Sequence, residues 1–447
     1  MMESHLFYQT RDRRPLLDRA EGLYMWDVNG KKYIDGSSGA MVSNIGHSNP
    51  AVLQAMQAQM AKSTFGYRLH FENEPAELLA RKVAELSPPG HNKVFFVSGG
   101  SEAVESAMKL ARQFAYSRGE GERWKIISRS PSYHGATLGA LSLTSYTPLN
   151  APFLPMHVAM PKVPAPRCYL DHDELSDDER GFRYAQMLRD KIVAEGPETV
   201  LAFIMEPVGG ASTGALVAPD SYYGHIRDIC DEFGVLLIYD EVMTGVGRTG
   251  KFLAAEHWHI NPDIIVTAKG FGAGYIPLGA LTARQSIVDT ILDSGGFQHG
   301  YTYAGNPIAC AAGLAVIDEI FRQKMMSNTV DRGVQLLAGL SQLKGKYAFI
   351  GDVRGKGLLT AFELVSDSAT MAPLPAALNV FSVLVELAYE RGLIIYSRRS
   401  SGGLEGDHFL VCPPMITSTQ QITDILAILD DSLASLAKML NLPTARP

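Results

Sequence analysis

The sequence predicts an α/β protein in which a mainly parallel β-sheet is covered by helices, with a smaller α+β domain beside it. Short apolar runs rich in β-branched residues alternate with longer amphipathic segments between residues 93 and 321. This alternation is typical of βαβ units, which build parallel sheets. From about residue 327 the pattern changes to that of an α+β segment. A chain of 447 residues is also long enough for two to three domains.

The chain begins with a hairpin signal. Between residues 22 and 36, apolar and polar side chains alternate on both sides of Asn29-Gly30, a dipeptide that favours a two-residue turn. Two amphipathic helices are expected next, over residues 49–62 and 74–86.

The central region alternates between expected strands and helices. The expected strands are apolar runs at residues 93–97, 125–128, 200–205, 235–239, 264–267 and 280–282. The expected helices cover residues 101–116, 221–233 and 308–321. Residues 158–182 break this pattern with three prolines and two acidic runs. We therefore interpret them as an excursion over the protein surface.

The C-terminal region completes the smaller domain. Its expected elements are helices near 329–343, 376–391 and 418–439 and strands around 353–364 and 393–397. We predict a division of the chain into three segments. Residues 1–60 join the small domain, residues 61–326 form the large domain, and residues 327–447 form the rest of the small domain.

Composition narrows the class of partner. The net charge of −7 leaves no basic footprint, so we predict no nucleic-acid partner. No apolar run approaches the roughly 18 residues of a membrane span, so no membrane partner is predicted. Residues 1–7 do not resemble a secretory signal. The four cysteines lack CxxC spacing and are interpreted as reduced thiols, which makes the cytoplasm the expected compartment.

Lys269 and Asp240 are charged residues at the ends of two predicted buried strands. Lys269 follows the apolar residues 264–268, and Asp240 follows 235–239. A charge in such a place is costly unless it is paired or used. A desolvated lysine loses its proton more easily and becomes a nucleophile toward carbonyls. A lysine that forms a Schiff base with pyridoxal phosphate, and an acid that holds the ring nitrogen, is one known arrangement that needs such a pair.

Other candidate residues follow neighbouring strands. The glycine-rich turn at residues 97–103 leads into a helix whose N-terminus suits a phosphate, although a simple tight turn explains it equally well. The turn is not a GxGxxG fingerprint, and no P-loop motif occurs in the sequence. Tyr133 could stack on a flat cofactor or be a packed tyrosine. Metal binding by Glu206, Asp240 and His134 lacks supporting ligand spacing, so we predict no metal.

Together these residues resemble the class III aminotransferases, pyridoxal-phosphate enzymes of fold type I that include ω-amino acid and amine transaminases. The resemblance covers nearly the whole chain. Its most specific stretch is LIYDEVMTGVGRTG at residues 237–250, and Lys269-Gly270 follows at the expected distance. The resemblance implies a pyridoxal 5'-phosphate cofactor and a seven-stranded, mostly parallel sheet in the large domain.

The resemblance also implies a role for each candidate. Lys269 would form the Schiff base and move the substrate proton, and Asp240 would pair with the ring nitrogen. The implied cofactor-binding residues are Gly100, Ser101, Tyr133, Glu206, Asp240, Val242, Lys269 and Thr302. Gly100 and Ser101 would hold the phosphate, and Tyr133 and Val242 would pack on the two faces of the ring. Thr302 would reach the phosphate of the neighbouring subunit, which implies a homodimer or a dimer of dimers.

The substrate side departs from the family pattern. After Glu206-Pro207-Val208 a glutamine is frequent, but here the residue is Gly209. Many ω-transaminases place one arginine in a C-terminal loop to bind the substrate carboxylate. That loop here contains Arg398 and Arg399, and Tyr67-Arg68 is a further candidate. Each arginine is equally well explained as a solvated surface charge.

We therefore predict a transaminase that moves an amino group from an ω-amino acid or amine to a keto acid such as pyruvate or 2-oxoglutarate, by a ping-pong mechanism. The alternative is a pyridoxal-phosphate-dependent isomerase on the same scaffold, either an amino acid racemase or epimerase or an aminomutase. A decarboxylase is a third use of this scaffold. These enzymes share the lysine and the aspartate and differ in where the proton returns.

Overall fold

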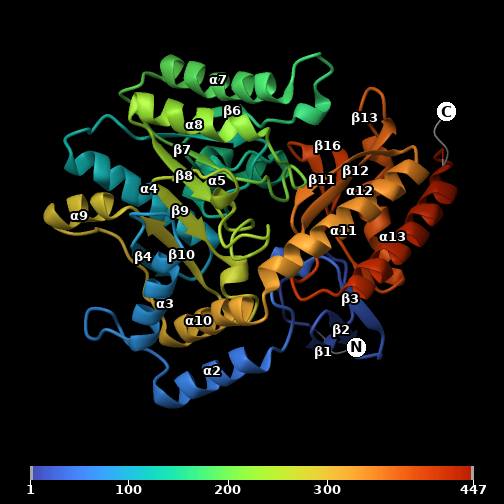
Figure 1. Ribbon diagram of the computed structural model, residues 1–447, viewed down its shortest axis with the longest axis horizontal. Coiled ribbons are helices and arrows are strands. Elements are labelled where there is room, and N and C mark those ends of the chain that lie inside the picture. The colour runs from blue at the N-terminus through green and yellow to red at the C-terminus, as the bar shows by residue number, and fades with distance from the viewer. Residues whose placement is uncertain (1–3, 444–447) are drawn as a thin grey trace.

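A seven-stranded sheet, here called the large sheet, lies at the centre of the larger part of the molecule (Figure 1). The computed structural model describes residues 4–443. The strand order is β4-β10-β9-β8-β7-β5-β6, and every strand except β10 runs in the same direction. The predicted mainly parallel sheet is therefore confirmed. The strands are β4 (Lys93–Val97), β5 (Lys125–Ser130), β6 (Lys162–Pro164), β7 (Val200–Met205), β8 (Leu236–Asp240), β9 (Ile264–Thr267) and β10 (Gly279–Ala283).

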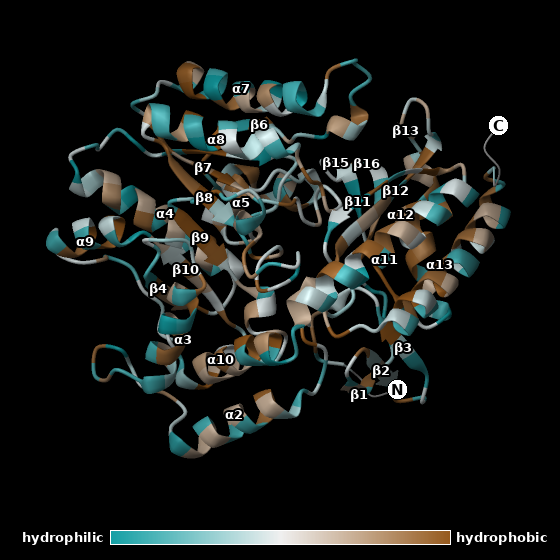
Figure 2. Ribbon diagram, viewed as in Figure 1, coloured by the Kyte–Doolittle hydropathy of each residue, from teal (hydrophilic) through white to brown (hydrophobic). Residues whose placement is uncertain are grey.

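Helices cover both faces of the large sheet. They are α4 (Gly100–Ser117), α5 (Leu138–Leu143) and α9 (Gln285–Asp293) on one face, and α7 (Asp177–Glu195) and α8 (Asp220–Phe233) on the other. Along β7, Ala202 and Ile204 pack with the first set and Phe203 and Met205 with the second. Alternate residues of a strand point to opposite faces, so a strand covered on both sides is apolar throughout. Figure 2 shows β7 and β9 in hydrophobic brown between the helices.

A five-stranded sheet, here called the small sheet, forms the centre of the smaller part of the molecule. Its main strands are antiparallel in the order β11-β12-β16-β15, and β13 pairs with β12. The strands are β11 (Ile350–Lys356), β12 (Leu359–Asp367), β13 (Ala372–Pro373), β15 (Tyr396–Ser401) and β16 (Glu405–Val411). The helices α11 (Met325–Lys346), α12 (Val380–Glu390) and α13 (Thr419–Leu440) share a hydrophobic core with it.

Strand pairing joins the N-terminal segment to the C-terminal one. The strands β1 (Leu17–Glu21), β2 (Tyr24–Asp27) and β3 (Lys32–Asp35) continue into β14 (Leu393–Ile394), which is parallel to β3. In contrast, α2 (Pro50–Lys62) and α3 (Glu74–Glu85) both pack against α10 (Pro307–Arg322), beside the large sheet. The predicted segment bounds at residues 60 and 326 stay a prediction. Residues 1–3 and 444–447 of those segments lie outside the described residues.

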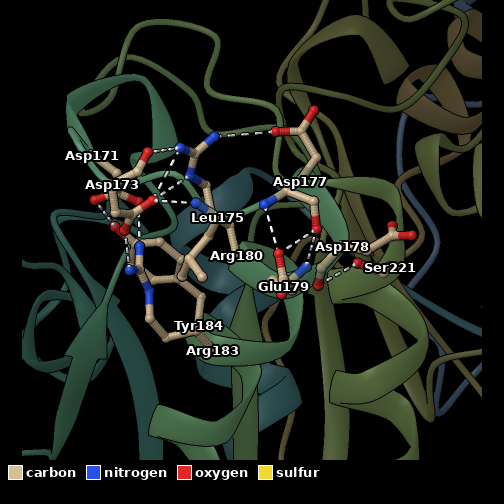
Figure 3. A network of polar contacts seen from close by, with 11 residues as sticks. Asp171, Asp173, Leu175, Asp177, Asp178, Glu179, Arg180, Arg183, Tyr184 and Ser221 are labelled. Carbon is tan, nitrogen blue, oxygen red and sulfur yellow. Dashed lines mark hydrogen bonds and ion pairs between the residues drawn. The ribbon is translucent and has the colours of Figure 1, made fainter.

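The excursion predicted for residues 158–182 is only partly a surface loop. It contributes the edge strand β6, where Pro164 is tolerated because one side of an edge strand needs no N–H donors. The acidic runs then fix the start of α7. Asp173 accepts hydrogen bonds from Arg180, and Asp171 forms an ion pair with Arg183 at 2.5 Å (Figure 3). A capping box of Ser176 and Glu179 caps the N-terminus of α7.

Three other sequence expectations need correction. The helix expected over residues 376–391 begins only at Val380, because Asn379 adopts a left-handed conformation with φ of 50°. The strand expected at 393–397 divides into β14 and β15, which belong to different sheets. Strand β16 and helix α9 were not expected. The remaining short elements are α1 (Ser38–Met41), α6 (Thr147–Asn150), η1 (Ala151–Met156), η2 (Cys168–Leu170), η3 (Ala254–His257), η4 (Lys269–Phe271) and η5 (Ala376–Leu378).

A fully buried arginine joins the two parts of the molecule beside the large sheet. Arg248 donates to the carbonyl oxygen of Pro413 at 2.6 Å, to Asn44 Oδ1 at 2.5 Å and to Ser38 Oγ at 3.0 Å. One guanidinium thus ties a loop of the larger part to both the N-terminal and the C-terminal segment. Within residues 4–443, no helix is long and apolar enough to cross a membrane.

Candidate active site

The ends of five strands of the large sheet meet at one edge and form the candidate site. Because β10 is antiparallel to both β4 and β9, β4 runs in the same direction as β5, β7, β8 and β9. Ligands of such sheets bind outside the carboxyl ends of the strands. A cavity of about 260 Å³ lies there. It is lined by seven of the predicted residues, namely Gly100, Ser101, Tyr133, Glu206, Asp240, Val242 and Lys269.

Asp240 is a buried carboxylate with two fixed partners. Its Oδ2 lies 2.8 Å from Nδ1 of His134, and its Oδ1 accepts the backbone N–H of Val242 at 3.1 Å. Since a carboxylate accepts, this contact puts a proton on His134 Nδ1. His134 Nε2 is buried and has no partner among the described residues. The two partners orient Asp240 within the pocket.

Lys269 lies at the start of η4, directly after β9. Its backbone φ is 48°, an uncommon left-handed conformation for a residue with a long side chain. Burial lowers the pKa of the Lys269 ammonium, while the charges of Asp240 and Glu206 oppose the shift. A lysine with a lowered pKa offers more of its neutral, nucleophilic amine at neutral pH.

Glu206 follows β7 and is the second carboxyl of the pocket. Its Oε1 accepts the backbone N–H of Gly210 at 2.9 Å, and its Oε2 is buried without a partner among residues 4–443. Burial raises the pKa of this carboxyl, although His134 and the guanidinium of Arg129 act in the opposite direction. Arg129 donates to the Glu206 backbone carbonyl. Glu206 therefore has an oxygen available to a molecule that enters the cavity.

The turn between β4 and α4 forms the other wall of the cavity. A Cβ atom added to Gly100 would lie 3.0 Å from Cγ1 of Val242, so only glycine fits without displacing this wall. The Ser101 hydroxyl accepts the N–H of Ala136 at 3.0 Å. Gly99, the residue before α4, makes no side-chain cap, so the first N–H groups of an 18-residue helix face the turn. This arrangement suits a phosphate group.

A second cavity of about 410 Å³ continues from the first and shares Tyr133, Ala211 and Lys269 with it. Many of its walls are apolar or aromatic, and they include Leu141, Tyr146, Phe153 and Tyr396. Arg398 also lines it, with its guanidinium 5.0 Å from the centre of the Tyr396 ring. One of the substrate candidates from the sequence, Arg398, therefore lies in this second cavity.

The structure does not bring the other candidates into either cavity of this chain. Arg399 Nε lies 3.4 Å from Oδ1 of Asp407, and its guanidinium also donates to the backbone carbonyls of Leu404 and Ala376. Arg68 packs over the ring of Phe95, and Tyr67 packs against His70. Thr302 is exposed on the surface. Within residues 4–443, no group of His, Cys, Asp and Glu side chains could hold a metal ion.

The sequence did not indicate that His134 belongs with Asp240. From the sequence, His134 was a candidate only as a metal ligand. Nothing in the spacing shows that β5 and β8 lie in the same part of the sheet, separated by β7 alone. The adjacent Tyr133 was the one available signal.

The fold and the pocket suit an enzyme in which a lysine and an aspartate would hold a phosphorylated aromatic cofactor. Comparison with known families then identifies it: the model of the family Aminotransferase class-III matches residues 8–433, and the chain belongs to this family. The family is pyridoxal-phosphate-dependent.

Relatives of the chain agree with this assignment. It is 37% identical over 429 residues to an uncharacterized aminotransferase, YodT, of Bacillus subtilis, covering 95% of this chain and 96% of that protein. It is 32% identical to a putrescine–pyruvate aminotransferase of Pseudomonas aeruginosa, covering 92% and 89%. The crystal structure of an (S)-enantioselective omega-transaminase from Thermomicrobium roseum superposes with a TM-score of 0.91 at 34% identity, covering 97% and 96%. The fold type I prediction is confirmed.

The residues present fit pyridoxal phosphate. The buried Asp240 matches a pyridinium nitrogen, the α4 turn matches a phosphate, and Lys269 matches the aldehyde carbon. Two buried polar atoms in the cavity wall, Glu206 Oε2 and His134 Nε2, lack partners in the described part of the chain. Such atoms are costly unless a bound molecule or water satisfies them.

Replacing His134 by alanine is expected to weaken binding of pyridoxal phosphate about 10-fold, because a hydrogen bond to a charged group contributes roughly 1.5–3 kcal/mol. His134→Asn keeps a donor near Nδ1 and should bind the cofactor nearly as tightly as the unsubstituted protein. Titration of the cofactor-free proteins, followed by fluorescence quenching, measures both affinities. An unchanged affinity in His134→Ala would show that Asp240 needs no support.

Proposed function

We propose that this class III aminotransferase moves an amino group from an ω-amino acid or amine donor to a keto acid such as pyruvate or 2-oxoglutarate. The observation that carries the proposal is the placement of Lys269, with its lowered pKa, in one cavity with Asp240 and Glu206. Relatives with the printed names putrescine–pyruvate aminotransferase and omega-transaminase support the choice of an amine donor.

Each residue of the pocket then has a chemical task. When bound, pyridoxal phosphate supplies an electron sink for the carbon that bears the amino group. The neutral amine of Lys269 takes the proton from that carbon and returns it at the next position. Asp240, fixed by His134 and the Val242 N–H, keeps the pyridine nitrogen protonated. The turn at Gly100 holds the phosphate away from the reacting atoms.

The second cavity supports a donor with an apolar body and a carboxylate at its far end. Of the residues that line it, Lys269 and Arg398 are the two basic side chains, and Arg398 is the one that keeps its charge at neutral pH. A guanidinium binds a carboxylate through two parallel hydrogen bonds, which a simple amine does not need. Leu141, Tyr146 and Phe153 would pack against the apolar body of the donor.

A second copy of the chain is the proposed partner. Thr302 lies beside Tyr303, which is 63% exposed and whose ring lies 5.9 Å from that of Phe65. Leu69 and Phe71, in the same segment as Phe65, are 75% and 72% exposed. Apolar residues gathered in this way mark an interaction surface. A homodimer would cover these apolar residues and would bring Thr302 to the partner's cofactor. A cytoplasmic location and a dimer of dimers stay predictions.

The first test is the half-reaction with an amine donor. Without a keto acid, donor should convert the bound cofactor to pyridoxamine phosphate, detected by absorbance and by chromatography of the extracted cofactor. Lys269→Ala removes the base and should lower turnover at least about 1,000-fold while the protein stays folded. Loss of substrate chirality without any pyridoxamine phosphate would instead indicate the isomerase alternative.

Arg398 and its neighbour Arg399 provide a matched pair for the substrate test. Arg398→Leu should raise the KM for an ω-amino acid about 10-fold or more, because a charge-assisted hydrogen bond is lost. The KM for an amine without a carboxylate should change little. Arg399→Leu should leave both values nearly unchanged, since Arg399 faces Asp407. Equal effects of the two substitutions on both substrates would contradict a carboxylate site at Arg398.

Sedimentation velocity tests the partner. The cofactor-loaded protein should sediment as a species of twice the 48.6 kDa chain mass. Tyr303→Asp places a charge in the apolar surface and should shift the equilibrium toward the monomer. A fully active monomer of the unsubstituted protein would rule out a shared site at Thr302.

A further inference from the structure

The loop of residues 209–214, here called the glycine loop, connects the active site with the small sheet. It follows Glu206 and Pro207 and is closed by a bridge between Val208 and Val217. At its near end, the N–H of Gly210 donates to Glu206 Oε1 at 2.9 Å. In its middle, Ala211 lines both cavities and Ser212 lines the second one. The glycine loop therefore forms the wall of the pocket on the substrate side.

The far end of the glycine loop is held by an arginine of the small sheet. Arg354, in β11, donates from Nε to the carbonyl oxygen of Gly214 at 2.7 Å and from Nη2 to that of Thr213 at 2.8 Å. Its own charge is balanced by Asp352 at 2.8 Å and Glu363 at 2.7 Å. Two acids thus fix the guanidinium, and the guanidinium fixes two backbone carbonyls.

A histidine of the small sheet holds the middle of the loop. His408, in β16, is fully buried, with Nε2 2.9 Å from the carbonyl oxygen of Ala211 and Nδ1 2.9 Å from the hydroxyl of Ser400. Burial lowers the pKa of His408 to about 4, so the ring is neutral near pH 7 and carries one proton. Because a carbonyl can only accept, that proton lies on Nε2, and Nδ1 accepts from Ser400.

Gly214 brings the backbone of the loop close to both residues that hold it. Gly214 adopts a φ of 63°, and a Cβ atom there would lie 2.8 Å from the His408 ring and 2.9 Å from Arg354 Nη2. A side chain at this position would therefore separate the loop from both residues that hold it. Because the contact is this close, the position of the small sheet determines the position of the glycine loop, which forms the pocket wall.

The same strands carry the substrate candidate Arg398. In the pairing of β15 with β16, Arg398 lies opposite His408. Cross-strand partners point to the same face of a sheet, so both side chains face the larger part of the molecule. One strand pair therefore sets two opposite borders of the second cavity, namely Arg398 directly and Ala211 through His408.

We propose that Arg354 and His408 are positioning residues that fix the glycine loop, and through Ala211 and Ser212 the width of the substrate cavity. This proposal rests on the proposed aminotransferase function. It assigns the small sheet to substrate recognition, whereas the cofactor residues Asp240, Lys269 and Gly100 belong to the large sheet. Loosening the loop should then change substrate affinity and leave cofactor affinity unchanged.

His408→Phe is the sharpest test, because it keeps a buried ring and removes the donor to Ala211, together with the acceptor for the Ser400 hydroxyl. The KM for the amino donor should rise about 5- to 10-fold, as expected for one lost hydrogen bond, with kcat and the cofactor Kd within about two-fold. His408→Gln places an amide N–H close to the position of Nε2 and should restore most of the KM. A KM unchanged in His408→Phe, or a parallel loss of kcat and cofactor binding, would overturn the proposal.

Arg354→Lys keeps the charge between Asp352 and Glu363 but loses the fork that reaches two carbonyls. It should raise the KM as His408→Phe does. Arg391→Lys is the matched control, because Arg391 also donates to a backbone carbonyl, that of Leu387 at 2.8 Å, but lies outside this contact. An equal KM in Arg354→Lys and Arg391→Lys would overturn the role of Arg354.

Hydrogen–deuterium exchange makes the test independent of the activity. Amides of residues 208–217 should exchange faster in His408→Phe and Arg354→Lys than in the unsubstituted protein, even if no amino donor is ever found. Unchanged exchange in this segment would refute the positioning role. Faster exchange without transamination by the unsubstituted protein would instead reject the proposed function.

Discussion

Two buried arginines hold the large and small sheets together around the pocket, and the geometry of the site depends on this joint. Among residues 4–443, Arg248 has no carboxylate partner within ion-pair distance; it donates to a carbonyl, an amide oxygen and a hydroxyl from both ends of the chain. Burial lowers its pKa to about 10, so it stays charged at neutral pH. Arg354 forms ion pairs with two carboxylates and donates hydrogen bonds to two backbone carbonyl oxygens. Burying a charge is favourable only when its surroundings are fully arranged, so each arginine fixes the segments that surround it.

The joint separates two tasks within one pocket. The large sheet brings the lysine, the aspartate and the phosphate turn to one edge, because parallel strands deliver their carboxyl ends there. The small sheet contributes Arg398 and, through the glycine loop, the wall at Ala211. Chemistry common to many amines can thus stay constant on one sheet while the other changes with the donor.

Sequence reasoning located the reactive residues but not their neighbours. Lys269 and Asp240 were found because a charge at the end of an apolar run is visible in the sequence. The partners His134, Arg354 and His408 were not found, since their contacts join strands that are adjacent only through the strand order. Strand β6 was missed because three residues that include a proline give no periodic signal. Thr302 and Arg68 lie outside both cavities of the candidate site, because the roles implied for them belong to segments that line neither cavity.

The adjacent Arg398 and Arg399 show what register adds to sequence. Two neighbouring residues of a strand point to opposite faces, so only one of them can reach the pocket. The sequence gives no reason to prefer either. The pairing of β15 with β16 decides, because it sets Arg399 opposite Asp407, with which it forms an ion pair, and Arg398 opposite His408. A slip of β15 by one residue against β16 would exchange the faces of the two arginines and would separate Ser400 from His408. The ion pair between Arg399 and Asp407, on the face of the sheet where Arg399 packs over Phe381, therefore helps to fix the register that places Arg398 in the second cavity.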